Sequence, residues 1–242
     1  MEKIIKKKIL ILGASSDIGI EVVKIFLDKN WEVIAQYNIN NSKLFKLKKK
    51  FTNLEVIKIN LDNIKMLNKI IKKKNKRFAN ISSFVCLSGY LKLSTFDNFS
   101  IKDFYKHINI NYFASLFFIR HLINDMKKNK WGRILTISSI GTKFGGAYNT
   151  FLYSLSKFMN QFFPRSIKNL AKLNILINCL QIGVTDTKLN FIDKDKNLKK
   201  RIELIPLKRL AKPKEVAQYI YFLLSEENTL ITSEVINISG GE

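Results

Sequence analysis

Residues 9–19 read Ile9-Leu10-Ile11-Leu12-Gly13-Ala14-Ser15-Ser16-Asp17-Ile18-Gly19. The apolar run predicts a buried strand, and the amphipathic pattern from Ile18 to Asp28 predicts a helix directly after it. Glycine in the joining turn lets the backbone bend tightly and approach a ligand closely. The N–H groups at the start of the helix favour negative charge, so this strand–turn–helix order indicates a site for a pyrophosphate.

Short apolar runs alternate with helical patterns along the rest of the chain, which is typical of a parallel sheet with crossover helices. We expect strands at residues 8–12, 32–36, 55–59, 83–87, 133–138, 175–180 and 235–238. We expect helices at residues 18–28, 42–51, 63–74, 101–128, 150–172 and 214–225. The strands are apolar throughout, which fits a sheet covered on both faces. The prediction is one doubly wound α/β domain over residues 1–242, with about seven strands.

Residues 185–206 depart from this alternation. The segment is polar, contains Asp193-Lys194-Asp195-Lys196 and follows the end of a predicted strand. Ligands of open α/β sheets bind beyond the carboxyl ends of the strands. We therefore expect a substrate loop at about residues 185–206, although a plain solvated loop would have the same composition.

The net charge of +23 comes from 42 Lys and Arg residues against 19 Asp and Glu residues. The positive charge is mostly lysine and is spread along the chain, so compositional drift explains it better than a stripe that binds nucleic acid. An anionic substrate or an acidic carrier protein would need only a basic rim near the site. No apolar run approaches the roughly 20 residues of a membrane-spanning helix, and the first apolar run is too short for a signal-peptide core.

The cysteine and histidine residues give little sign of special chemistry. Cys86 and Cys179 lie in apolar runs, so we expect reduced, buried thiols in a cytoplasmic protein. His107 and His121 lack acidic or cysteine partners at ligand spacing, so no metal site is predicted.

A tyrosine and a lysine supply the strongest chemical signal. They stand in the run Tyr153-Ser154-Leu155-Ser156-Lys157. This spacing places the phenol and the ammonium one helical turn apart on the same face. A nearby ammonium favours the phenolate and would lower the tyrosine pKa from about 10, which makes Tyr153 a candidate general acid or base. Taken alone, the spacing also fits a surface tyrosine stacked on a lysine stem.

Other segments agree with these two motifs. They are the strand end Gly132-Arg133-Ile134-Leu135-Thr136-Ile137-Ser138-Ser139, the segment from Gly183 to Thr187, and the stretches 205–217 and 231–241. Together with the glycine turn and the Tyr-x-x-x-Lys pair, they resemble the short-chain dehydrogenase/reductase family over nearly the whole chain. The resemblance implies a Rossmann-type domain that binds NAD(P).

The resemblance also implies the cofactor contacts. Gly13 and Gly19 match the ends of the family's Thr-Gly-x-x-x-Gly-x-Gly turn, but Asp17 stands where the middle glycine is usual. We expect Asp17 to cap the following helix and to alter, without abolishing, cofactor binding. The implied cofactor-binding residues are Gly13, Ser15, Ser16, Asp17, Ile18, Gly19, Asn38, Asn60, Leu61, Gly89, Tyr153, Lys157, Gly183, Thr185 and Thr187.

The same resemblance implies a catalytic set. Tyr153 would give its proton to a substrate oxygen as general acid, while Lys157 would lower the tyrosine pKa and hold the nicotinamide ribose. Ser139, with Ser138 as the alternative, would donate a hydrogen bond to the carbonyl. The family's asparagine aligns with Asn111 and would anchor a water that links the lysine to solvent.

Two points of alignment and specificity stay open. Asn109 is a near neighbour of Asn111, so a slip in the alignment would exchange the two. The second strand ends in Tyr37-Asn38, without the acidic residue that selects NAD in similar proteins, so NADP(H) is favoured over NAD(H). The arginine or lysine that often marks phosphate-accepting relatives is missing from the same position.

The function that follows is an NAD(P)(H)-dependent carbonyl reductase or alcohol dehydrogenase. The overall likeness to 3-oxoacyl-acyl-carrier-protein reductases makes a 3-oxoacyl thioester the first candidate substrate. The alternative is a catalytically weak or inactive family member that acts as a binding or assembly subunit. Its support comes from departures from the family pattern at Asp17, Leu87, Ser88 and Ile182.

The two long predicted helices carry more phenylalanine than a monomer surface would tolerate. These residues are Phe113, Phe117, Phe118, Phe151, Phe158, Phe162 and Phe163. Some must be core, and the excess predicts contact between subunits in a homodimer or homotetramer, as in similar proteins. Pro164 should kink the second helix, because proline removes a backbone hydrogen bond.

Overall fold

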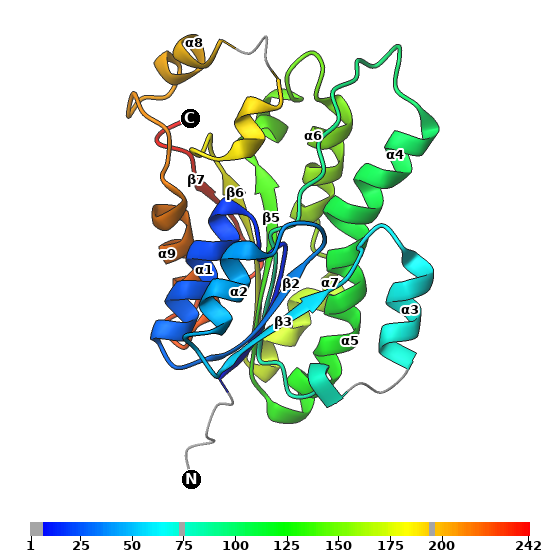
Figure 1. The fold of residues 1–242 in the computed structure, drawn as a ribbon, viewed down its shortest axis with the longest axis vertical. Helices are drawn as coiled ribbons and strands as arrows, with labels where there is room; N and C mark the ends of the chain where they lie inside the picture. Colours follow the sequence, from blue (N-terminus) through cyan, green and yellow to red (C-terminus); the bar gives the residue numbers. More distant parts are fainter. Residues whose placement is uncertain (1–6, 73–75, 194–196) are drawn as a thin grey trace.

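The computed structural model describes residues 7–72, 76–193 and 197–242 (Figure 1). A parallel sheet of seven strands runs in the order β3-β2-β1-β4-β5-β6-β7. The strands are β1 Lys8–Leu12, β2 Glu32–Tyr37, β3 Leu54–Lys58, β4 Ser83–Cys86, β5 Gly132–Ser139, β6 Ile175–Ile182 and β7 Val235–Ile238. The predicted doubly wound α/β class is confirmed, and every strand begins and ends within two residues of its predicted place.

Helices cover both faces of this sheet (Figure 1). The α-helices are α1 Asp17–Asp28, α2 Ser42–Lys48, α3 Ile64–Lys72, α4 Ile101–Ile108, α5 Ala114–Asn129, α6 Phe151–Phe158, α7 Arg165–Lys168, α8 Leu198–Glu203 and α9 Pro213–Leu224. The shorter helical turns are η1 Lys76–Phe78, η2 Asn109–Phe113, η3 Ile140–Phe144, η4 Met159–Gln161, η5 Asn169–Leu173 and η6 Lys188–Phe191. The last two residues of the predicted helix 63–74 lie outside the described residues.

The alternation of side chains along β1 shows why the sheet needs both helical layers. Ile9 and Ile11 belong to the core beneath α1 and α9, whereas Leu10 and Leu12 belong to the core beneath α5. All four side chains are fully buried. A strand that is buried on both faces must be apolar at every position, as the sequence predicted.

The strand order reverses beside β1, which pairs with β2 on one side and with β4 on the other. Helices therefore leave the sheet in opposite directions at this point, and a crevice opens beyond the carboxyl ends of the strands. The glycine turn after β1 and the loop after β4 meet at this crevice. The fold thus brings the predicted cofactor-binding segments to one edge of the sheet.

Two predicted helices were wrong in detail. The helix expected at residues 101–128 is interrupted by a π-helical turn, Asn109–Phe113. The helix expected at 150–172 does not kink but stops, because Phe162 is extended at φ −85° and ψ 119°. Pro164 explains the stop, since a proline lacks the N–H that a helix interior needs and disfavours the helical conformation in the residue before it.

Cys86 and Cys179 are free, buried thiols, as predicted. Burial raises the pKa of Cys179 to about 11, so this thiol is protonated at neutral pH. Among the described residues, no helix combines the length and apolar character needed to cross a bilayer.

Candidate active site

A cavity of about 850 Å³ opens at the carboxyl edge of the sheet. Its wall brings together residues from the glycine turn, the β4 loop, β5, α6 and the substrate loop. The predicted residues on the wall are Ser15, Ser16, Asp17, Ile18, Gly89, Ser138, Ser139, Tyr153, Lys157, Gly183, Thr185 and Thr187. Segments that are far apart in the sequence thus form one site.

Five predicted cofactor-binding residues do not lie on this wall. Gly13 and Gly19 shape the turn from behind it. Asn38 and Asn60 are exposed, and Leu61 is buried in the core beneath α5. The Asn60 side-chain oxygen accepts a hydrogen bond of 3.0 Å from the Asp62 N–H. Contacts from Asn38, Asn60 and Leu61 to a cofactor therefore stay predictions.

The glycine turn is fixed by a close approach of two loops. Gly13 has φ +70°, and a β-carbon there would lie 2.4 Å from the Ser88 nitrogen, so a side chain cannot be accommodated. The cap of α1 is Ser16, whose hydroxyl oxygen accepts a hydrogen bond of 3.0 Å from Gly19 N–H. The prediction that Asp17 caps the helix was wrong, because Ser16 has the extended conformation of a cap and Asp17 is already the first helical residue.

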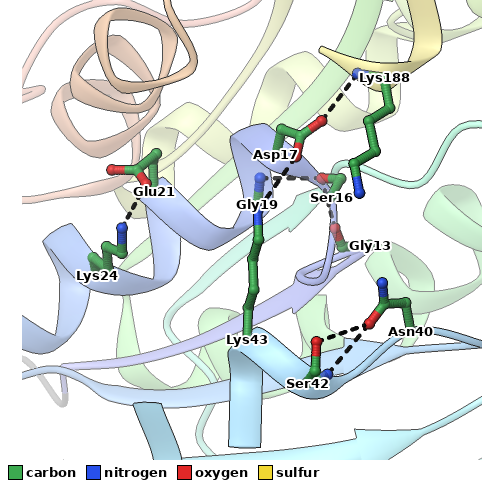
Figure 2. Close-up of polar contacts among 10 residues, drawn as sticks. All are labelled: Gly13, Ser16, Asp17, Gly19, Glu21, Lys24, Asn40, Ser42, Lys43 and Lys188. Carbon is green, nitrogen blue, oxygen red and sulfur yellow. Dashed lines mark hydrogen bonds and ion pairs between the residues drawn. The ribbon is translucent and has the colours of Figure 1, made fainter. Parts of the chain in front are cut away.

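Asp17 instead joins two other segments of the site (Figure 2). One carboxylate oxygen accepts a hydrogen bond of 3.0 Å from the Lys188 N–H in η6. The other oxygen lies 3.6 Å from the Lys43 ammonium, on the first turn of α2. Both lysines line the cavity, as does Asn40 before α2.

Sequence reasoning missed Lys43 as a residue of the site. The reason is that α2 is rich in lysine, and its sequence does not show which lysine faces the cavity. The position of Lys43 at the start of α2, shortly after the end of β2, was the available signal. The cation at the edge of the cavity that follows β2 therefore comes from α2, and the strand end itself carries Tyr37 and Asn38, as predicted.

Tyr153 and Lys157 share α6 and the cavity wall, with the ammonium 5.9 Å from the centre of the tyrosine ring. Burial raises the pKa of Tyr153 to about 12 and lowers the pKa of Lys157. The lysine side chain donates a hydrogen bond of 3.3 Å to the Ser88 carbonyl. The expectation that the ammonium lowers the tyrosine pKa is not met, because desolvation disfavours the charged form of both groups.

The π-helical turn η2 carries Asn111, which is 2% exposed. Its side chain accepts a hydrogen bond of 2.7 Å from Tyr90 N–H and donates to the Tyr90 carbonyl at 2.9 Å and to the Ser156 hydroxyl at 2.8 Å. Asn109 instead donates to Asp62. Asn111 therefore ties the β4 loop to α6 beside the tyrosine–lysine pair, and the water it was expected to anchor stays a prediction.

The two candidate serines at the end of β5 differ in their surroundings. The hydroxyl oxygen of Ser139 accepts a hydrogen bond of 3.3 Å from Gly141 N–H, which leaves its own O–H to donate. Ser138 is buried, and its oxygen accepts a hydrogen bond of 2.8 Å from the Gln161 side chain. Ser139 is the less buried of the two and is the better donor to a molecule in the cavity.

The substrate loop forms part of the cavity wall rather than lying free in solvent. Its residues 194–196 lie outside the described part of the chain, and the rest includes η6 and α8. The chain just before the loop makes a close contact, since a β-carbon on Gly183 would lie 2.6 Å from the Ser239 α-carbon. The loop residues on the wall are Thr185, Thr187, Lys188, Leu189, Asn190, Ile192, Asp193, Asn197, Lys200, Arg201 and Leu204.

Comparison with known proteins agrees with this arrangement. A family model described as Enoyl-(Acyl carrier protein) reductase matches residues 13–242. The chain belongs to the short-chain dehydrogenase/reductase family. As a member of that family it is an oxidoreductase with a Rossmann-type fold. The alternative of a catalytically weak or inactive member that acts as a binding or assembly subunit would share this membership, so measurements of nucleotide binding and turnover distinguish the two.

Several named proteins are similar to this chain over most of its length. The 3-oxoacyl-acyl-carrier-protein reductase of Aquifex aeolicus is 30% identical over 186 residues, which cover 76% of this chain and 75% of the relative. The reductase of the same name from Thermotoga maritima is 28% identical over 240 residues, 97% of each chain. A solved structure described as ElxO with NADP bound superposes with a TM-score of 0.85 at 27% identity, over 98% of each chain.

Proposed function

We propose that this chain reduces ketone groups with NADPH, and that it catalyses the reverse oxidation of secondary alcohols with NADP⁺. The observation that carries the proposal is a protonated phenol, Tyr153, on the same cavity wall as the Ser139 hydroxyl. Reduction of a carbonyl requires a proton donor and a hydrogen-bond donor at the substrate oxygen. These two hydroxyl groups supply both.

Each residue has a separate task in this proposal. A bound nicotinamide would supply the hydride to the carbonyl carbon. Tyr153 would hold its proton at the phenol oxygen and release it to the substrate oxygen, while Ser139 would donate a hydrogen bond that orients and polarises the carbonyl. Lys157 would hold the ribose next to the nicotinamide. Asn111 would hold the loop after β4 in place against α6, through its hydrogen bonds with Tyr90 and Ser156.

The residues present fit a dinucleotide. The main-chain N–H groups of Asp17 and Ile18 begin α1 and have no acceptor within the helix, and both residues line the cavity. Such a helix start binds phosphate groups. Gly89 lies on the same wall, and a β-carbon there would meet no atom within 4 Å, so the cavity is open beside it.

We further propose that NADP(H) is preferred over NAD(H). Lys43 and Asn40 line the cavity after β2, where an acidic residue would select NAD. An ammonium and a neutral amide both suit the extra phosphate of NADP. The similarity to a structure described as containing NADP gives independent support.

The substrate class that we propose is a 3-oxoacyl thioester, with other ketones as the wider class. The names of the relatives support a 3-oxo group, whereas the description of the family model names an enoyl reductase. Addition of hydride to a carbonyl places negative charge on oxygen, next to which Tyr153 and Ser139 are suitably placed donors. Apolar side chains of the substrate loop, Leu189, Ile192 and Leu204, would face the acyl chain.

We also propose self-association into a homodimer or homotetramer. Phe117 and Phe118 are core residues, but Phe158 at the end of α6 and Phe162 directly after η4 are 57% and 73% exposed. Exposed aromatic side chains of this size are typical of protein contacts. Light scattering coupled to size-exclusion chromatography should give the mass of two or four chains, and a monomer at micromolar concentration would contradict this part of the proposal.

Two measurements test the proposal: the binding of nicotinamide nucleotides and then the oxidation of NADPH by candidate substrates. Titration of NADPH and NADH, followed by nicotinamide fluorescence, should show tighter binding of NADPH. A panel of 3-oxoacyl thioesters, simple ketones and enoyl thioesters should then show oxidation of NADPH with the ketones and not with the enoyl thioesters. Binding of neither nucleotide, or reduction of the enoyl thioesters alone, would contradict the proposal.

A further inference from the structure

The carboxylate of Asp17 connects parts of the site that the sequence keeps far apart. Lys188, whose N–H donates to Asp17, is 171 residues away, in the substrate loop. Lys43, whose ammonium lies 3.6 Å from the other carboxylate oxygen, belongs to α2 and to the cofactor side of the cavity. Figure 2 shows the carboxylate between these two partners at the start of α1.

The two contacts make different demands on residue 17. The bond from the Lys188 N–H needs an acceptor, which the oxygen of a neutral amide also supplies, although more weakly than a carboxylate. The ion pair with Lys43 needs a negative charge. One substitution can therefore remove the charge and keep the acceptor, and another can remove both.

The position of Asp17 also bears on the cofactor. The start of α1 favours a negative group, and the side chain of Asp17 occupies this region with 24% of its surface exposed. The dinucleotide phosphates of the proposed function would approach the same helix start. The aspartate and these phosphates would then repel each other. Asp17 would also compete for Lys43 with the extra phosphate of NADP, which the proposed function places beside that lysine.

We propose that Asp17 is a positioning residue with two roles, and the proposal rests on the proposed function. Its carboxylate fastens the start of the substrate loop through Lys188, so that the loop is ordered before the substrate arrives. Its charge competes with the extra phosphate of NADPH for Lys43, so that the chain binds NADPH less tightly than it otherwise would. The residue thus exchanges some cofactor affinity for a preformed substrate wall.

The test compares Asp17→Asn with Asp17→Ala in the full chain. NADPH dissociation constants should fall roughly two- to fivefold in Asp17→Asn at low salt, the size expected for one partly exposed charge. This gain should fade near ~0.5 M salt, because exposed charges are then screened. Hydrogen exchange of the cofactor-free protein around Lys188 should stay at the wild-type rate in Asp17→Asn and become faster in Asp17→Ala.

A third readout separates positioning from a general effect on the fold. The KM for the ketone should rise severalfold in Asp17→Ala and remain unchanged in Asp17→Asn, with similar melting temperatures. Glu21→Gln is the matched control, since Glu21 lies one turn further along α1 and pairs with Lys24 at 2.6 Å (Figure 2). This control should leave nucleotide affinity, exchange and KM unchanged.

Three results would overturn the proposal. Unchanged or weaker NADPH binding in Asp17→Asn would exclude the competition for Lys43. Equal exchange rates in the two variants would exclude the role of the acceptor. If Asp17→Ala does not fold, Asp17→Gly, which also removes the acceptor and the charge, takes its place, and exchange around Lys188 at the wild-type rate in that variant would exclude the role equally. If the wild-type chain bound no nucleotide while exchange still separated the variants, the proposed function and the competition would both be wrong, and the link to Lys188 would stand.

Discussion

Substitution of Lys157 by methionine should stabilise the cofactor-free protein while abolishing its activity. Lys157 is 4% exposed, and among residues 7–72, 76–193 and 197–242 its ammonium makes one long hydrogen bond, 3.3 Å to the Ser88 carbonyl, although an ammonium can donate three. Burial accordingly lowers its pKa. Replacement of a poorly compensated buried charge by an apolar side chain of similar length should raise the free energy of unfolding by about 1–3 kcal/mol.

The gain depends on pH in a defined direction. Because the folded-state pKa lies below the unfolded-state value, the wild-type protein loses stability as pH falls through the folded-state pKa of Lys157. The methionine variant lacks this loss, so its advantage should be largest at low pH and shrink as pH rises. For a chain of this size, each kcal/mol corresponds to roughly 2–4 °C in melting temperature.

Thermal unfolding followed by circular dichroism, at several pH values and without nucleotide, measures this effect. Lys102→Met on α4 is the control, since Lys102 is exposed and its replacement should change the melting temperature little. A melting temperature of Lys157→Met below that of wild type would refute the reasoning. It would mean that the buried ammonium is a net source of stability and not a cost accepted for function.

Three further predictions concern single residues. Ser139→Ala should lower kcat for ketone reduction by roughly 10²–10³-fold, the usual effect of losing one donor to a developing oxyanion, while Ser138→Ala should lower it much less; equal losses in steady-state NADPH oxidation would contradict the assignment. Lys43→Ala should weaken NADPH binding by about tenfold and change NADH binding by less than about twofold, as fluorescence titration would show; an equal loss for both nucleotides would remove the phosphate contact. His107 is fully buried, and its Nε2 accepts a hydrogen bond of 3.3 Å from the Lys92 N–H. Burial lowers the pKa of this imidazole below the value of about 6.5 that it has in the unfolded chain. The free energy of unfolding should therefore fall as pH drops below about 6.5, because the unfolded state gains the proton more readily than the folded state. In His107→Gln the melting temperature should change less with pH between about pH 7 and pH 5 than it does in wild type. An unchanged dependence of the melting temperature on pH would assign the acid sensitivity to other groups.

The strands could be predicted closely from the sequence, and two helices could not. Continuous apolar runs such as Ile9 to Leu12 are distinctive, because few other structures bury every position of so short a segment. The helix break at 109–113 left no comparable trace, since the helical pattern continues through it. The contacts of this turn are non-local, since Asn111 bonds to the main chain of Tyr90, which lies 21 residues away. The break before Pro164 was visible in the sequence, and only its severity was underestimated.

Most residues of the candidate site could be predicted from the sequence, whereas their pKa shifts and ion pairs could not. Motif spacing identified Ser139, Tyr153 and Lys157 on the cavity wall, because sequence order and a known fold fix their places. The raised pKa of Tyr153 depends on how completely neighbouring segments exclude water, which helical spacing does not report. The contacts of Asp17 with Lys43 and Lys188 likewise arise only when three separate segments meet.

The central claim is that the Tyr153 phenol gives its proton to the substrate oxygen during reduction. Single-turnover oxidation of bound NADPH by a saturating ketone, compared between wild type and Tyr153→Phe, tests it most directly. The variant should bind NADPH as tightly as wild type and reduce the ketone at least ~10²-fold more slowly, which is the usual share of a general acid. Reduction at the wild-type rate by Tyr153→Phe, with NADPH binding intact, would contradict the claim and leave the fold and the family unaffected.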